Sequence, residues 1–140
     1  MSWGDDTRMY VALVTASVFF MVRALIIKIA AGPDQAERAN QGLTVAAAGT
    51  AMGAAVSLWL TGEAVWFAVS GRQPDLGLEH AQPAADLLEQ VAASGTVTVC
   101  SQCATRRDLT EGDLVDGARI AGAAAFVAES LAPDAQALVY

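Results

Sequence analysis

Two cysteines with two residues between them, Cys100 and Cys103, are the most reactive groups in this sequence. A cysteine attacks as a thiolate, so a reactive site must lower the pKa of its thiol. The short β-branched run from Thr96 to Cys100 predicts a strand that ends at Cys100. A helical turn beginning near Ser101 places the sulfur at the positive end of a helix, which favours an anion. The motif therefore predicts thiol chemistry at Cys100.

The residues that follow Cys100 are expected to assist it. Cys103 can act as a resolving thiol, because side chains three residues apart on a helical turn are neighbours and can form a disulfide. Arg106 and Arg107 lie further along the same segment and add positive charge near the thiol. This positive charge and the helix dipole both favour the thiolate form of Cys100.

Zinc is the alternative ligand of a CxxC pair. A structural zinc site needs a full set of cysteine or histidine ligands, and beyond the two cysteines this sequence contains a single histidine, His80, in a polar loop. The sequence also has no glycine-rich phosphate-binding loop and no Ser–His–Asp arrangement with suitable spacing. We therefore expect neither a bound metal nor a cofactor.

The charge of the chain argues against a nucleic-acid partner. The net charge is −7, from 8 basic and 15 acidic residues, whereas nucleic-acid-binding proteins carry a basic patch. An acidic surface aids solubility or attracts a basic protein partner. Only two cysteines, in one CxxC motif, indicate a reducing compartment rather than a secreted disulfide scaffold. We expect a cytoplasmic protein.

The elements that must position the thiols alternate between strands and helices. The sequence predicts strands over 22–31, 54–60, 96–100, 118–121 and 137–140, and helices over 35–52, 63–69, 83–93 and 122–131. This alternation is typical of an α/β fold with a mostly parallel sheet covered on both faces. Reactive groups of such folds lie beyond the carboxyl ends of the strands. The loops 32–34 and 61–63 and Cys100 are all expected there.

The first 20 residues stand apart from this pattern. The apolar run from Tyr10 to Val22 is too short to cross a bilayer, and Asp5 and Asp6 occupy the place where a signal peptide has basic residues. We interpret residues 1–20 as an extension and residues 21–140 as a single domain, with no membrane segment. A membrane or export segment at 1–20 is the alternative interpretation.

From about Met21 onward, the chain resembles the DsrE family of small sulfur-relay proteins. The most specific likeness is VTVCSQCATRRDLTEGDLVDGARIAG, residues 97–122, which is similar to the cysteine loop of that family. Two further stretches carry it, GPDQAERANQGLTVAAAGTAMG at 32–53 and VSLWLTGEAVWFAVSG at 56–71.

The resemblance implies a three-layer α/β/α sandwich on a five-stranded parallel sheet, assembled as a homo-oligomer, a trimer or a hexamer. It implies a sulfur-relay or sulfurtransferase role, in which a cysteine at a strand end carries sulfane sulfur as a persulfide between donor and acceptor proteins. By this resemblance the functional residues are Cys100, Cys103 and Arg107, since the family has an arginine about seven residues after its reactive cysteine.

Two other hypotheses fit a lone CxxC motif. One is a thiol–disulfide oxidoreductase or redox sensor that cycles between the dithiol and the Cys100–Cys103 disulfide. The other is a non-catalytic oligomeric binding module in which the thiols are structural or metal-bound.

Overall fold

The computed structural model describes residues 23–140, and residues 1–22 lie outside the described part. The interpretation of residues 1–20 as an extension therefore stays an expectation. The described residues form one five-stranded, all-parallel sheet with the strand order β4-β3-β2-β1-β5. The strands are β1 (Ala24–Ile29), β2 (Ala55–Leu60), β3 (Thr96–Cys100), β4 (Ala118–Ala121) and β5 (Ala135–Val139).

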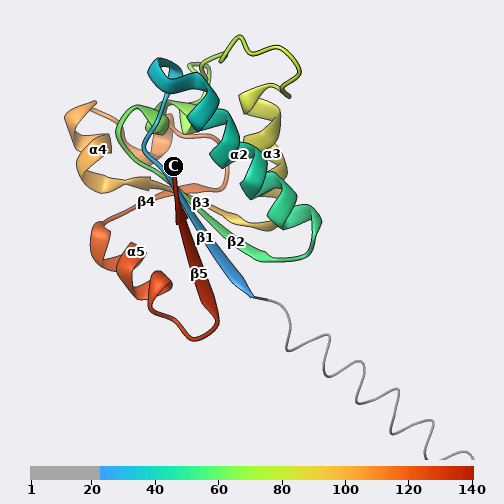
Figure 1. Cartoon of the computed structure of the whole chain (residues 1–140). Helices are drawn as coiled ribbons and strands as arrows, with labels where there is room; N and C mark the ends of the chain where they lie inside the picture. The colour runs from blue at the N-terminus through green and yellow to red at the C-terminus, as the bar shows by residue number, and fades with distance from the viewer. Residues whose placement is uncertain (1–22) are drawn as a thin grey trace, which may run out of the picture.

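Helices connect these strands and lie on both faces of the sheet (Figure 1). The helices are η1 (Pro33–Gln35), α2 (Ala36–Ala51), η2 (Gly62–Ala68), α3 (Ala84–Ser94), α4 (Ser101–Arg106), η3 (Glu111–Asp113) and α5 (Ala123–Ser130). The predicted α/β fold is confirmed. The short helix expected over 63–69 is a 3-10 helix, and the last strand begins two residues earlier than predicted.

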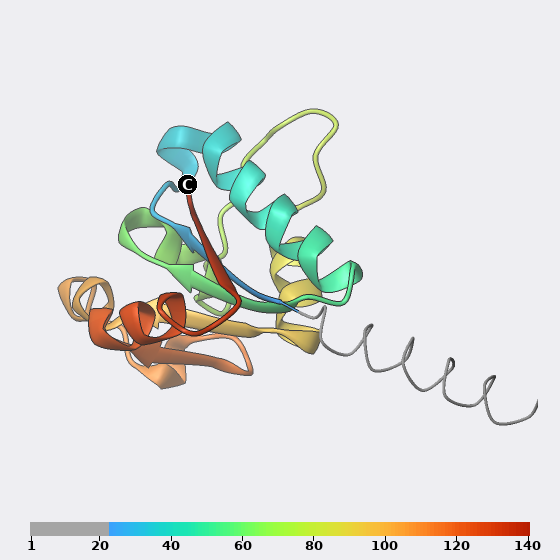
Figure 2. The ribbon, with the colours of Figure 1, turned by 60° about the horizontal axis from the view of Figure 1, so that its bottom comes forward.

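The handedness of parallel crossovers explains why α5 lies alone on its face. The chain moves across the sheet in one direction from β1 to β4, and then returns past β1 to β5. Because crossovers between parallel strands are right-handed, a reversal of direction moves the connecting helix to the opposite face. Figure 2 shows the sheet nearly edge-on, with α2 and α5 on opposite sides.

The two faces of the sheet differ in polarity. Side chains alternate along a strand, so Leu25, Ile27 and Ile29 of β1 point to the α2 side, where Gly49 lies against Leu25 and Gly42 against Ile29. This side carries the main hydrophobic core, which also takes residues from β2, β3, α2, α3 and η2.

The opposite side, beneath α5, receives polar side chains. They are Lys28 of β1, Ser57 and Trp59 of β2, Thr98 of β3 and Arg119 of β4. No residue of α5 is fully buried. The polar and charged side chains of the strands therefore lie mainly on the face beneath α5, which is covered less completely.

Candidate functional site

Three loops that are far apart in the sequence meet at the carboxyl edge of the sheet, as predicted. The loop after β1 reaches the loop after β2 at Gly32, where an added Cβ would lie 2.6 Å from the Cβ of Glu63. The loop after β2 reaches the CxxC segment, because the backbone N–H of Gly62 donates a hydrogen bond of 3.1 Å to the Sγ of Cys103. The thiols therefore lie in a site built from the ends of β1, β2 and β3.

Cys100 is the last residue of β3, and α4 begins at the next residue, so the chain turns at the reactive sulfur. Its side chain is half-buried, and its backbone is still extended, with φ −60° and ψ 127°. The Cys100 sulfur can therefore be reached from solvent. It also lies at the first turn of α4, whose backbone N–H groups have no partner within the helix.

The surroundings of Cys100 favour its thiolate. Burial by itself raises the pKa of the Cys100 thiol, but hydrogen bonds from the backbone N–H and thiol of Cys103 and from the backbone N–H of Gln102 lower it, and so does the positive charge of Lys28. The lowering effects prevail, so the pKa of Cys100 is below its ordinary value. A larger fraction of the thiol is therefore nucleophilic near neutral pH.

Cys103 lies in a different environment, although it is only three residues away. It is buried, with 8% of its surface exposed, and packs in the core against η2 and α4 neighbours. Its sulfur accepts the hydrogen bond from Gly62, whose φ of +53° favours glycine. Both cysteines are free thiols. Cys100 is thus the accessible member of the pair and Cys103 the enclosed one.

Arg107 lies beside the thiols but is bound to other groups. One guanidinium nitrogen forms an ion pair of 2.8 Å with Glu63, and the other donates to the carbonyl oxygen of Cys103 at 3.1 Å. Arg107 thereby ties the end of α4 to the start of η2, which holds Cys103 against Gly62. Arg106 is exposed. The expectation that these arginines activate Cys100 stays a prediction.

Sequence reasoning missed Lys28. It lies on β1, on the face of the sheet that also carries Cys100, and its Nζ lies 5.0 Å from the centroid of the Phe126 ring. A lone lysine inside an otherwise apolar strand, Ala24–Ile29, is the signal that could have identified it. Lysine is rarely buried inside an apolar strand, because its ammonium group does not contribute to hydrophobic packing.

Glu129 of α5 is the second residue that was missed, and it anchors α5 to the sheet. Its Oε2 accepts hydrogen bonds from the hydroxyl of Ser57 at 2.6 Å and from Nε1 of Trp59 at 2.9 Å. Its Oε1 pairs with Arg119 at 2.8 Å, and Arg119 also donates to the hydroxyl of Thr98 at 2.9 Å. Three strand residues, Ser57, Trp59 and Arg119, therefore converge on one carboxylate.

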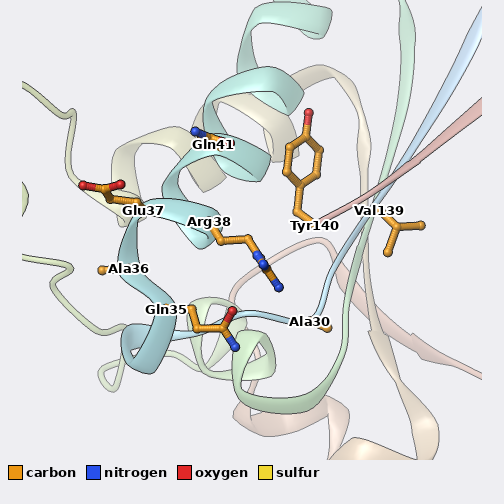
Figure 3. A pocket seen from close by; sticks show the side chains of 8 residues that line it. All are labelled: Ala30, Gln35, Ala36, Glu37, Arg38, Gln41, Val139 and Tyr140. Carbon is orange, nitrogen blue, oxygen red and sulfur yellow. The ribbon is translucent and has the colours of Figure 1, made fainter.

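An open pocket of about 960 Å³ lies beside the carboxyl ends of β1 and β5, where the direction of the chain reverses. Open parallel sheets commonly bind ligands at this point. Figure 3 shows Gln35, Arg38 and Tyr140 among the side chains that line it. Neither cysteine lines this pocket, so we distinguish it from the thiol site. His80, in an exposed loop with φ 59°, does not line it either.

Two searches of residues 23–140 bear on other classes of function. No group of three or more histidine, cysteine or acidic side chains is arranged to hold a metal ion within this range. No helix in the same range is long and apolar enough to cross a membrane.

Comparisons with known proteins find a matching family and similar structures. The sequence pattern of the DsrE/DsrF-like family matches residues 23–135. The YchN protein from E. coli has a similar structure, with a TM-score of 0.70 and 22% identity over 86% of this chain and 100% of that one. The protein of unknown function MTH1491 from Methanobacterium thermoautotrophicum is similar with a TM-score of 0.58 and 8% identity, over 84% and 99% of the two chains. No curated protein sequence matches this chain.

Proposed function

Because this chain belongs to the DsrE/DsrF-like family, we propose that it is a sulfur-relay protein that carries sulfane sulfur as a persulfide on Cys100. The observation that carries the proposal is the placement of Cys100. Its thiol is accessible at the end of β3, and its pKa is lowered although burial opposes this, by hydrogen bonds from Cys103 and Gln102 and by the charge of Lys28. Arg107 and Cys103 complete the proposed site.

The proposed transfer consists of two exchange steps. The Cys100 thiolate attacks the terminal sulfur of a donor persulfide, an S–S bond forms on Cys100, and the S–S bond of the donor breaks so that its thiolate leaves. An acceptor thiolate then attacks the terminal sulfur on Cys100, which leaves as a thiolate. No net oxidation occurs, because each step exchanges one S–S bond for another.

Cys103 gives this site a second outcome. Its thiolate can attack the inner sulfur of the Cys100 persulfide, forming the Cys100–Cys103 disulfide and releasing hydrosulfide. In the reduced protein Cys103 is buried and accepts a hydrogen bond from Gly62, so it must leave this contact before it attacks. We expect release to be slower than transfer to an accessible acceptor.

A thiol–disulfide oxidoreductase is the second candidate, because the two free thiols are three residues apart and Cys103 helps to lower the pKa of Cys100 against the effect of burial. Intact-mass spectrometry of the reduced protein, after exposure to a small-molecule persulfide, separates the two. The sulfur-relay proposal predicts a gain of one sulfur atom, located on the Cys100 peptide. A loss of two hydrogens, with no sulfur-loaded species at any time, contradicts the relay proposal and favours the oxidoreductase.

The relay needs partners and a compartment that keeps its thiols reduced. We propose the cytoplasm, because free thiols persist in a reducing environment. Donor and acceptor proteins must bring their own sulfur to the edge of the sheet where β3 ends. We also propose that the chain forms a homo-oligomer, a trimer or a hexamer.

The exposed apolar side chains around α5 support a homo-oligomer. Val127 is 49% exposed, Leu131 78% and Val139 66%, and together they flank the least covered face of the sheet. We expect replacement of both Val127 and Leu131 by glutamate to convert the assembly to monomers, because buried carboxylates cannot be accommodated at an apolar interface. Light scattering coupled to gel filtration measures the mass.

Met52→Glu is the matched control for this prediction. Met52 is 87% exposed at the end of α2, so a charge there should leave the assembly intact. A native chain that runs as a monomer, or a double variant with the mass of the native assembly, contradicts the proposed interface.

A further inference from the structure

Lys28 is the only lysine of the sequence, and it lies inside the sheet. Its strand, β1, is flanked on both edges by β2 and β5, and its neighbours Ile27 and Ile29 are buried. Lys28 itself is half-buried. Because a cation loses hydration when it is buried, a lysine in such a strand needs groups that compensate its charge.

The ring of Phe126 supplies part of this compensation. The Nζ of Lys28 lies 5.0 Å from the ring centroid, within the range of a cation–π interaction. The ring is itself fixed, because it packs edge-on against Trp59 with centroids 5.5 Å apart and an interplanar angle of 78°. Trp59 is buried and bonded to Glu129. The ammonium group is thus held by a rigid aromatic pair.

The carboxylates near this face are engaged elsewhere. Glu129 of α5 pairs with Arg119 of β4, and Glu63 pairs with Arg107. Neither ion pair in the described part of the chain involves Lys28. An aromatic ring stabilises a cation but does not neutralise it, so the positive charge of Lys28 stays available to an anion nearby.

Cys100 provides such an anion. The pairing of the strands places Lys28 beside Trp59, Trp59 beside Thr98, and Cys100 two residues beyond Thr98 on the same face. Of the other titratable groups around the thiol, Cys103 is enclosed against Gly62. Burial raises the pKa of Cys100, and the charge of Lys28 contributes to lowering it, after the hydrogen bonds from Cys103 and Gln102.

We propose that Lys28 stabilises the anionic sulfur of Cys100, as thiolate and as persulfide, and that Phe126 positions the ammonium group for this task. The persulfide part rests on the proposed function, whereas the thiolate part does not.

The experiment measures the rate of alkylation of Cys100 by iodoacetamide as a function of pH. The Cys103→Ser variant serves as the parent, since a single thiol avoids coupled titration. Lys28→Met removes the charge and keeps the length of the side chain, and Lys28→Arg keeps the charge. Phe126→Leu removes the ring. Arg38→Gln is the matched control, because it removes one positive charge from an exposed residue of α2 that has no assigned role at the thiols.

We expect Lys28→Met to shift the midpoint of the alkylation profile to higher pH and to slow alkylation at neutral pH by roughly threefold to tenfold. Lys28→Arg should keep most of the parent's alkylation rate. The rate of Phe126→Leu should lie between the rates of Lys28→Met and Lys28→Arg. Arg38→Gln should follow the parent, because an exposed charge is screened by solvent. A purely structural role of Lys28 does not predict rescue by arginine.

A Lys28→Met profile that superimposes on the parent overturns the proposal, and so does a Lys28→Arg profile like that of Lys28→Met. If Lys28→Met does not fold, the other two variants decide. A Lys28→Arg profile shifted well to higher pH, or a Phe126→Leu profile that superimposes on the parent, then overturns the proposal. Persulfide loading of the native chain is measured separately. If the native chain loads sulfur but the Lys28→Met profile is unshifted, only the role of Lys28 is refuted. If the Lys28→Met profile is shifted but the native chain does not load sulfur, only the relay is refuted.

Discussion

Replacement of Cys100 by serine is expected to abolish sulfur loading, whereas replacement of Cys103 by serine should leave loading intact. Cys100 is the half-buried thiol at the end of β3, and its pKa is lowered, against burial, by hydrogen bonds from Cys103 and Gln102 and by Lys28. A serine hydroxyl is a far weaker nucleophile than a thiolate at neutral pH. Intact-mass spectrometry after exposure to a small-molecule persulfide measures the loaded fraction.

The Cys103→Ser variant should also retain its sulfur longer than the native chain. Without the Cys103 thiol, the Cys100 persulfide cannot release hydrosulfide by forming the internal disulfide. The decay of the sulfur-loaded species, followed by mass in the absence of an acceptor, measures this lifetime. Equal loading of the two single variants, or loading of Cys100→Ser alone, contradicts the assignment of Cys100 as the carrier.

The layout of the fold could be predicted because strand and helix patterns agree with the connection rules. Short apolar runs such as Ala55–Leu60 alternate with helical stretches such as Ala36–Ala51, which requires a parallel sheet. Parallel sheets gather the loops after their strands at one edge. For this reason the sequence predicts the loops 32–34 and 61–63 and Cys100 at one edge, and the structure places them there. The contact of Gly62 with Cys103 was not predicted.

The electrostatics of the site could not be predicted in the same way. The sequence places Arg106 and Arg107 near Cys100, but side-chain direction decides which charge acts on the sulfur. Arg107 turns to Glu63, a residue 44 positions earlier in the chain. Lys28 lies on β1, which is two strands away in the sheet from β3, the strand of Cys100. Neither relationship has a local signal, because both depend on the strand order.

The polarity of the α5 face was also hidden in the sequence. Ser57, Trp59 and Thr98 occur in strands that look apolar overall. The carboxylate that Ser57 and Trp59 share lies in an alanine-rich helix. Only the register of β2 and β3 shows that these side chains point to the same face as Arg119. The residue that unites them, Glu129, reads in the sequence as an ordinary solvent-facing glutamate near a helix end.

Replacement of Glu129 by alanine is expected to lower the free energy of unfolding by about 2–4 kcal/mol. The carboxylate accepts hydrogen bonds from Ser57, Trp59 and Arg119, so its removal leaves three donors beneath α5 without a partner. Unsatisfied donors in a partly buried site cost more than the bonds contribute. Glu129→Gln, which retains an acceptor, should cost less. Urea denaturation at fixed protein concentration measures both differences.

The same contacts make this stabilisation depend on pH. Burial raises the pKa of Glu129, but the hydrogen bonds from Ser57 and Trp59 and the charge of Arg119 prevail and lower it. A carboxyl group with a depressed pKa in the folded state stabilises the fold fully above its unfolded value of about 4.3. This contribution is lost as the pH falls through the folded value, because both states are then protonated.

The difference in unfolding free energy between the native chain and Glu129→Gln should therefore shrink as the pH is lowered from neutrality to below about 4. Taking this difference removes the effect of other acidic groups, such as Asp113, whose pKa is lowered by its hydrogen bonds with Thr110. Glu79→Gln, in an exposed loop, is the matched control and should change stability little at any pH. A difference between native chain and Glu129→Gln that stays constant down to acidic pH contradicts this account, because it means that the carboxylate charge does not hold α5 on the sheet.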